Sequence, residues 1–186
     1  AVLAFSASQT GDKVGCIFFS DKVEKFIPPK KGRSHILAII RELVGFVPES
    51  NGTAISEAVR YLTGVNKKRC TAFLLSDFLN SKRDDTALND ALKIASSRHD
   101  IIALKVSDPR EREMPDVGIV ELQDAETGRK VWVDTASKAV RDHYATAWTE
   151  REEKTRELLL HNRIDIADVS TDSDYVAELI KLFKKR

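Results

Sequence analysis

Two short apolar segments, 71–76 and 101–106, and the helical pattern between them constrain the fold of this chain most. Both segments are largely apolar without alternation, which is typical of strands buried on both faces of a sheet. Leu88, Leu92 and Ala95 recur between them at helical spacing. The pattern predicts a β-α-β unit, whose right-handed crossover would make the two strands parallel neighbours.

Strand-like and helix-like patterns also alternate along the rest of the chain. Further strands are predicted at 13–20, 22–27 and 164–169, helices at 1–7, 34–44, 55–62, 140–159 and 176–183, and a β-hairpin insertion near 118–133. Only Ser20 and Asp21 separate the first two strands, so the second should pair antiparallel at an edge and end at Pro28 and Pro29. The sequence therefore predicts an α/β fold with a mostly parallel sheet, one antiparallel edge strand and covering helices.

The first predicted helix has no start signal and no strand ahead of it. We therefore expect residues 1–186 to form a single domain that is truncated at its amino end. A sheet that lacks a central strand would leave two neighbouring edges unpaired, and unpaired edges favour self-association.

Composition and charge exclude several classes of partner. Lysine and arginine number 30 and aspartate and glutamate 29, so a net charge of +1 provides no field that would attract nucleic acid. No apolar run approaches the roughly 18–20 residues that span a bilayer. Cys16 and Cys70 lie in or beside apolar strands, which favours buried free thiols in a reducing compartment. We therefore expect a cytoplasmic protein without a membrane-spanning segment.

An acidic residue and a hydroxyl are placed where ligands collect in parallel sheets. Asp77 follows the apolar strand at 71–76, and Thr53 opens the helix that precedes this strand. Because ligands bind at the carboxyl ends of parallel strands, these two oxygen-bearing side chains are predicted to converge there. Two oxygen ligands favour a hard cation.

Several longer segments resemble a known family. The chain is similar to the carboxyl-terminal part of bacterial domain-of-unknown-function family fifty-eight, whose members contain a von Willebrand factor type A-like domain. The segments that carry the resemblance are GDKVGCIFFSDKVEKFIPPKKG, RELVGFVPESNGTAISEAVRYL, FLLSDFLN, RHDIIALKVSDPREREMPDVG, LQDAETGRKVWVD and STDSDYV.

The resemblance implies a Rossmann-like, three-layer α/β/α fold with a metal-ion-dependent adhesion site. Thr53 matches the family's threonine loop and Asp77 its aspartate loop. The Asp-x-Ser-x-Ser loop that follows the family's first strand does not occur in this sequence. The resemblance thus implies Mg²⁺ or Mn²⁺ in the complete domain, with the remaining ligands in the missing loop and little occupancy in this chain.

The resemblance also implies a function without catalysis. It points to a metal-dependent protein-interaction module that acts as an adaptor for a MoxR-type AAA+ ATPase. The alternatives are a metal-dependent hydrolase or phosphatase that uses the same crevice, and a scaffold whose site is vestigial.

The site residues also have structural alternatives. Thr53 would serve equally as a helix N-cap, and Asp77 could bind backbone amides of its own loop.

Overall fold

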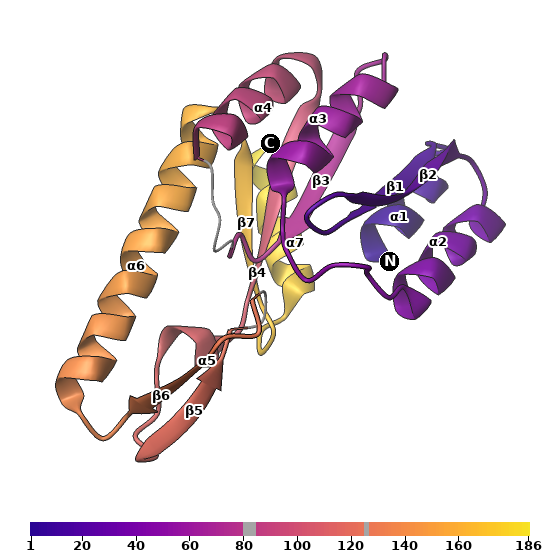
Figure 1. The fold of residues 1–186 in the computed structure, drawn as a ribbon. Coiled ribbons are helices and arrows are strands. Elements are labelled where there is room, and N and C mark those ends of the chain that lie inside the picture. Colours follow the sequence, from indigo (N-terminus) through magenta and orange to yellow (C-terminus); the bar gives the residue numbers. More distant parts are fainter. Residues whose placement is uncertain (80–84, 125–126) are drawn as a thin grey trace.

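A parallel sheet of three strands forms the centre of the molecule (Figure 1). The computed structural model describes residues 1–79, 85–124 and 127–186. The sheet has the order β3 (Thr71–Ser76), β4 (Asp100–Ser107) and β7 (Asp165–Ser170). β3 and β4 are parallel neighbours connected through α4 (Asp85–Arg98), which confirms the predicted β-α-β unit.

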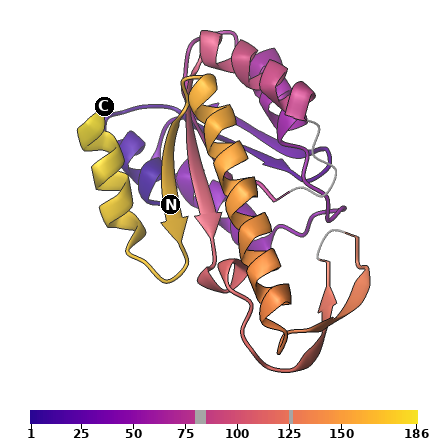
Figure 2. The same ribbon diagram turned by 90° about the vertical axis from the view of Figure 1, so that its left-hand side faces the viewer.

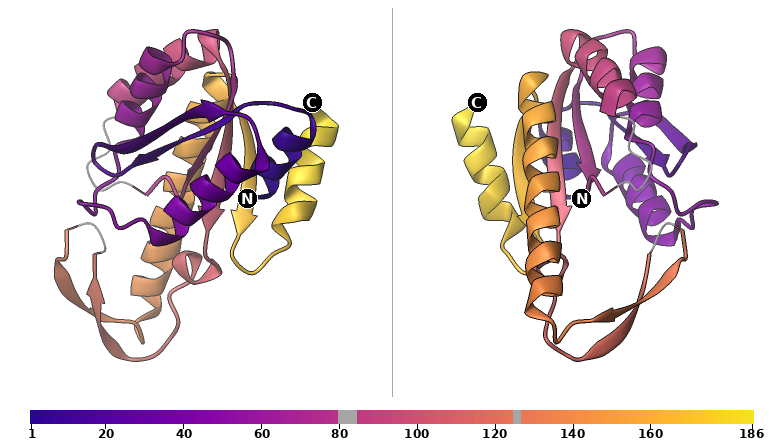
Figure 3. Two further views of the ribbon diagram at one scale, coloured as in Figure 1. Left: turned by 90° about the vertical axis from the view of Figure 1, so that its right-hand side faces the viewer. Right: turned by 60° about the vertical axis from the view of Figure 1, so that its left-hand side comes forward.

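Helices cover both faces of this sheet (Figures 2 and 3). Side chains from α3 (Ile55–Val65), α4 and α6 (Lys138–His161) pack on one face. The other face is covered by α7 (Tyr175–Lys185), with Leu3 of α1 (Val2–Gln9) packed beside it. The expected mixed α/β architecture with a helix-covered parallel sheet is therefore confirmed.

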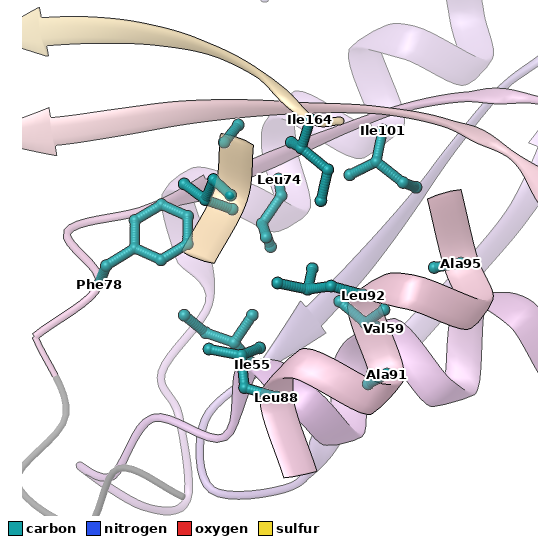
Figure 4. Packing of buried hydrophobic residues seen from close by; sticks show 12 residues of the cluster. Ile55, Val59, Leu74, Phe78, Leu88, Ala91, Leu92, Ala95, Ile101 and Ile164 are labelled. Carbon is teal, nitrogen blue, oxygen red and sulfur yellow. The ribbon is translucent and has the colours of Figure 1, made fainter. Parts of the chain in front are cut away.

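Most of the buried apolar side chains form one cluster between the sheet and α3, α4 and α6 (Figure 4). Its members are Ile55, Val59, Leu74, Phe78, Leu88, Ala91, Leu92, Ala95, Ile101, Ala103, Leu159 and Ile164. A second cluster of Ile102, Leu104, Ala167, Leu179 and Leu182 lies on the α7 face. Both faces of β4 are therefore buried, as its continuous apolar run predicts.

β1 (Val14–Phe19) and β2 (Val23–Lys30) form a separate two-stranded sheet, followed by α2 (Arg33–Gly45). The predicted antiparallel pairing is confirmed. The expectation that this pair forms the edge of the parallel sheet is not met among the described residues, because β1 forms a ladder with β2 alone.

The second strand also runs past the point where it was predicted to end. β2 continues through Pro28 and Pro29 to Lys30, which pairs with Val14 across a register shift. Edge strands tolerate proline because their outer amides need no partner. Gly15 makes room for this path, since a Cβ there would lie 2.8 Å from the carbonyl oxygen of Ile27 and 3.0 Å from Pro29.

The predicted hairpin insertion is confirmed. β5 (Ile119–Gln123) and β6 (Lys130–Asp134) pair antiparallel in a sheet of their own, after the short helix α5 (Pro109–Arg112). The hairpin lies near the amino end of α6, at the opposite end of the molecule from α4 (Figure 1).

Both cysteines are free thiols. Burial raises the pKa of Cys16 and of Cys70 above the ordinary thiol value, so both are protonated near neutral pH. Among the described helices, none has the length and apolar character required to cross a bilayer.

The packing of α4 leads to a stability prediction. Leu92 is 0% exposed within the larger cluster, whereas Ile94 on the same helix is 51% exposed. Leu92→Ala should lower the free energy of unfolding by about 3 kcal/mol, because it removes buried methyl groups and leaves a cavity. Ile94→Ala, the matched control, should lower it by less than about 1 kcal/mol. Urea unfolding followed by circular dichroism measures both, and equal losses would contradict this packing.

Candidate functional site

The candidate site lies at the carboxyl end of the parallel sheet. Parallel strands end on the same side, and here the last residues are Ser76, Ser107 and Ser170. Asp77 follows Ser76 directly, so its carboxylate lies in the first loop at this end.

Local hydrogen bonds shape the loop that carries Asp77. Ser76 Oγ accepts a bond of 3.0 Å from the amide of Phe78, and Asp77 Oδ1 accepts one of 3.0 Å from the amide of Leu79. The alternative role of Asp77, binding loop amides, is therefore correct for this oxygen. Among the described residues, no hydrogen bond reaches the other oxygen, Oδ2.

The backbone of this loop adopts an unusual conformation at Phe78. Its φ is 58°, in the left-handed region that bulky residues rarely adopt, and its ring is buried in the larger core cluster. Strained backbone of this kind is concentrated at functional sites. No pattern in the sequence indicates this conformation, because phenylalanine does not favour a positive φ.

Thr53 lies in the loop before α3 but does not cap the helix. The N-cap of α3 is Ala54, without a side-chain capping bond, so the alternative reading of Thr53 as N-cap is wrong. The amide of Ala54 instead donates a bond of 2.7 Å to the carbonyl oxygen of Ser20, at the end of β1. A hydrogen bond therefore joins the start of α3 to the end of β1.

The loops of Thr53 and Asp77 join the same part of the core. Ile55, two residues after Thr53, and Phe78, next to Asp77, both belong to the larger cluster (Figure 4). Both loops therefore lie next to residues of one core cluster. Joint metal binding by Thr53 and Asp77 stays a prediction.

The donor set agrees only in part with a divalent cation. A hydroxyl and a carboxylate are suitable oxygen ligands for Mg²⁺, which retains several waters at most protein sites. In residues 1–79, 85–124 and 127–186, however, no group of three or more His, Cys, Asp or Glu side chains is placed to hold a metal. Thr53 and Asp77 would thus need further ligands for tight binding.

An ion pair with a buried lysine lies beside Asp77, and sequence reasoning missed it. Lys105 of β4 is 7% exposed on the α6 face of the sheet, where its ammonium group forms an ion pair with Glu152 of α6. The parallel register places Lys105 between Ser76 of β3 and Asp168 of β7. One signal existed in the sequence, since Lys105 is the only charged residue in the run 101–107.

A small cavity separates this ion pair from the Asp77 loop. Asp77, Lys105, Trp148 and Glu152 contribute to its walls, and its volume of about 10 Å³ is room for one water molecule. Trp148 Nε1 is buried without a hydrogen-bond partner among the described residues. A buried indole N–H normally has a partner, so a bound water is the simplest occupant.

Asp108 connects two further loops at this end of the sheet. Its carboxylate accepts bonds from the amide of Arg110 at 2.9 Å and from the hydroxyl of Thr171, after β7, at 2.9 Å. These two bonds hold the pKa of Asp108 below its ordinary value, and the bond from the Arg110 amide has the larger effect. The loops after β4 and β7 are thus joined to each other.

Comparison with known proteins gives the family. The model of the family "Protein of unknown function DUF58" matches residues 1–154. The chain belongs to the DUF58 family. Uncharacterized protein Rv1480 of Mycobacterium tuberculosis is 28% identical to this DUF58 chain over the whole length of this chain. The chain spans 58% of the length of that relative. Uncharacterized protein MAV169 of Mycobacterium avium is 28% identical over 86% of the chain and 93% of its own length.

Two solved structures share the fold of this DUF58 chain. The conserved hypothetical protein BatB from Bacteroides thetaiotaomicron matches with a TM-score of 0.54 and 18% identity, over 99% of this chain and 86% of that one. An aerotolerance-related membrane protein from Bacteroides fragilis matches with a TM-score of 0.51 and 18% identity, over 94% and 80% of the two chains. At this identity the likeness concerns the fold alone.

The Lys105–Glu152 pair leads to a second stability prediction. Glu152→Gln should lower the free energy of unfolding by about 2 kcal/mol, because it leaves the buried ammonium group without its counter-charge. Lys105→Met should lower the free energy of unfolding by less than Glu152→Gln does, since a methionine fills similar space without a charge. Chemical denaturation at neutral pH measures both variants.

The control is Glu49→Gln, which breaks the exposed pair between Lys22 and Glu49. It should change the free energy of unfolding by less than about 1 kcal/mol. A Glu152→Gln loss no larger than this control would show that the Lys105 pair contributes nothing to stability.

Proposed function

We propose that this DUF58 chain is part of a protein-interaction module that binds its partner at the carboxyl end of the parallel sheet. One observation supports this most: in the strained loop at Phe78, one oxygen of Asp77 accepts the amide of Leu79, and no described residue bonds the other. The Thr53 loop joins the same core cluster. A carboxylate oxygen that no described residue bonds, in a loop packed on the core, suits recognition of a ligand.

The finer fold assignment belongs to this proposal. We infer a Rossmann-like, three-layer domain of the von Willebrand factor A type. The helix-covered parallel sheet and the similarity to BatB at a TM-score of 0.54 support it. The other ligands would then come from the Asp-x-Ser-x-Ser loop of such a domain.

Mg²⁺ or Mn²⁺ is the proposed cofactor of the complete domain. Thr53 and Asp77 would hold it, and the bound ion would supply a coordination position for a carboxylate of the partner. The resemblance of the sequence to its family makes a MoxR-type AAA+ ATPase the proposed partner. Binding would then depend on the divalent ion.

The chemistry of the lysine beside the site, and of the two thiols elsewhere in the chain, supports a binding role rather than catalysis. The ammonium group of Lys105 is paired with Glu152, so it is not a free base. Both thiols are half-buried with a raised pKa, which disfavours the nucleophilic thiolate. A hydrolase that uses this crevice would need another nucleophile or an activated water.

The proposal predicts metal-dependent binding that two side chains control. In the complete domain, Mg²⁺ should strengthen capture of the AAA+ ATPase by roughly tenfold or more, and Thr53→Ala or Asp77→Asn should abolish this gain. Binding is measured by titration with and without Mg²⁺. The matched control is Asp142→Asn, which changes an exposed aspartate on α6.

Three results would contradict the proposal. Binding that ignores Mg²⁺ would exclude the metal, and unchanged binding by both variants would exclude the site. Hydrolysis of a generic phosphoester that Asp77→Asn abolishes would favour the hydrolase instead.

A further inference from the structure

The outer edge of β6 is an exposed strand edge. Among the described residues, β6 forms a ladder with β5 alone and makes extensive contact with no other element. Most of its side chains are exposed, including Trp132 at 69%. The hairpin also projects away from the parallel sheet (Figures 1 and 2). Edges of this kind pair readily with another strand unless something blocks them.

The hairpin register shows which backbone groups point outward. The backbone amide of Thr135 donates to the carbonyl oxygen of Gly118 at 2.9 Å, and the backbone amide of Asp124 donates to that of Arg129 at 2.9 Å. Hydrogen-bonded pairs alternate along an antiparallel ladder, so Val131 and Val133 direct their amides and carbonyls toward β5. The corresponding groups of residues 130, 132 and 134 therefore face the open edge.

The sequence of β6 is Lys-Val-Trp-Val-Asp, with opposite charges at its two ends. Two antiparallel copies of it therefore place lysine opposite aspartate. We propose that two copies of this chain pair antiparallel through β6, with Trp132 opposite Trp132 of the second copy. This register places Lys130 opposite Asp134 of the other copy, twice per dimer. Residues 130, 132 and 134 also carry the outward-facing backbone groups, so the ladder and the charge pairs use the same register.

Four kinds of interaction stabilise this dimer. The ladder adds about six backbone hydrogen bonds, and the two opposite-charge pairs and the tryptophan pair lie directly across from each other. On the other face, Val131 and Val133 join Val120 and Leu122 of β5 in one apolar surface across four strands. A lone two-stranded hairpin is marginally stable in water, and four strands are more stable.

Existing contacts are compatible with this register. Lys130 Nζ already donates to Glu121 Oε2 at 2.7 Å, but an ammonium group has three protons. Asp134 Oδ1 accepts from the amide of Ala136 at 3.0 Å, and its second oxygen can accept from Lys130 of the other copy. The outer edge of β5 is a poorer choice, because its equivalent symmetric pairing would place Glu121 opposite Glu121.

Charge reversal tests the dimer and its register. An edge-strand contact is small, so we expect a dissociation constant on the order of 10–100 µM, measured by sedimentation equilibrium. Lys130→Asp alone, or Asp134→Lys alone, places like charges opposite each other and should weaken the dimer by roughly tenfold or more. The double variant Lys130→Asp/Asp134→Lys should restore it.

Mixing the two single variants provides a second test. One then carries aspartate at both positions and the other lysine at both, so they should form a heterodimer more tightly than either pairs with itself. Lys154→Asp, an exposed charge reversal on α6, is the matched control and should leave the dimer unchanged. Circular dichroism shows that each variant is folded.

The outcomes decide the proposal either way. Restoration by the double variant and by mixing supports it. A wild-type chain that stays monomeric up to about ten times the expected dissociation constant overturns it. A dimer that ignores both single reversals, or that neither the double variant nor mixing restores, also overturns it, since association would then use another surface such as the edge of β3.

Discussion

The burial of β4 on both faces is the constraint on which the rest of the structure depends. Ile102 and Leu104 face α7, while Ile101 and Ala103 face α4 and α6, so one strand contributes to both core clusters. A strand in this position needs a parallel neighbour on each side and helices above and below. The register set by β4 then fixes where the loops after β3 and β7 begin, and with them the position of Asp77.

Residue periodicity was sufficient to predict the central elements. The strands at 71–76 and 101–106, the helix between them and the hairpin near 118–133 were found because each buries its apolar residues in a regular local pattern. Local periodicity does not predict contacts between distant segments. Ala54 rather than Thr53 occupies the N-cap position of α3, and its amide bonds to Ser20. Buried Lys105 pairs with Glu152, 47 residues further along the chain.

The β1–β2 pair also shows that local patterns predict strand pairing but not tertiary placement. Its pairing follows from a two-residue connection, which is local, whereas its attachment to the molecule depends on tertiary contacts. Phe19 packs against the larger core cluster, and the carbonyl of Ser20 accepts the amide of Ala54. Among the described residues, side-chain contacts and the bond between Ala54 and Ser20 thus hold the pair in place. The positions of β4 and β7 are instead set by the ladder of the parallel sheet.

Energetics explain how the Asp77 loop keeps its shape. The left-handed backbone of Phe78 costs about 1–2 kcal/mol, whereas burial of a phenylalanine ring contributes about 1.5–3 kcal/mol. The ring of Phe78 lies in the same cluster as Ile55 and Leu88, so the core offsets the strain. Packing of the Phe78 ring thus holds residues 77–79, the described part of this loop, without a ligand. The carboxylate of Asp77 is therefore held in place in advance, which would lower the entropic cost of the binding proposed for this end of the sheet.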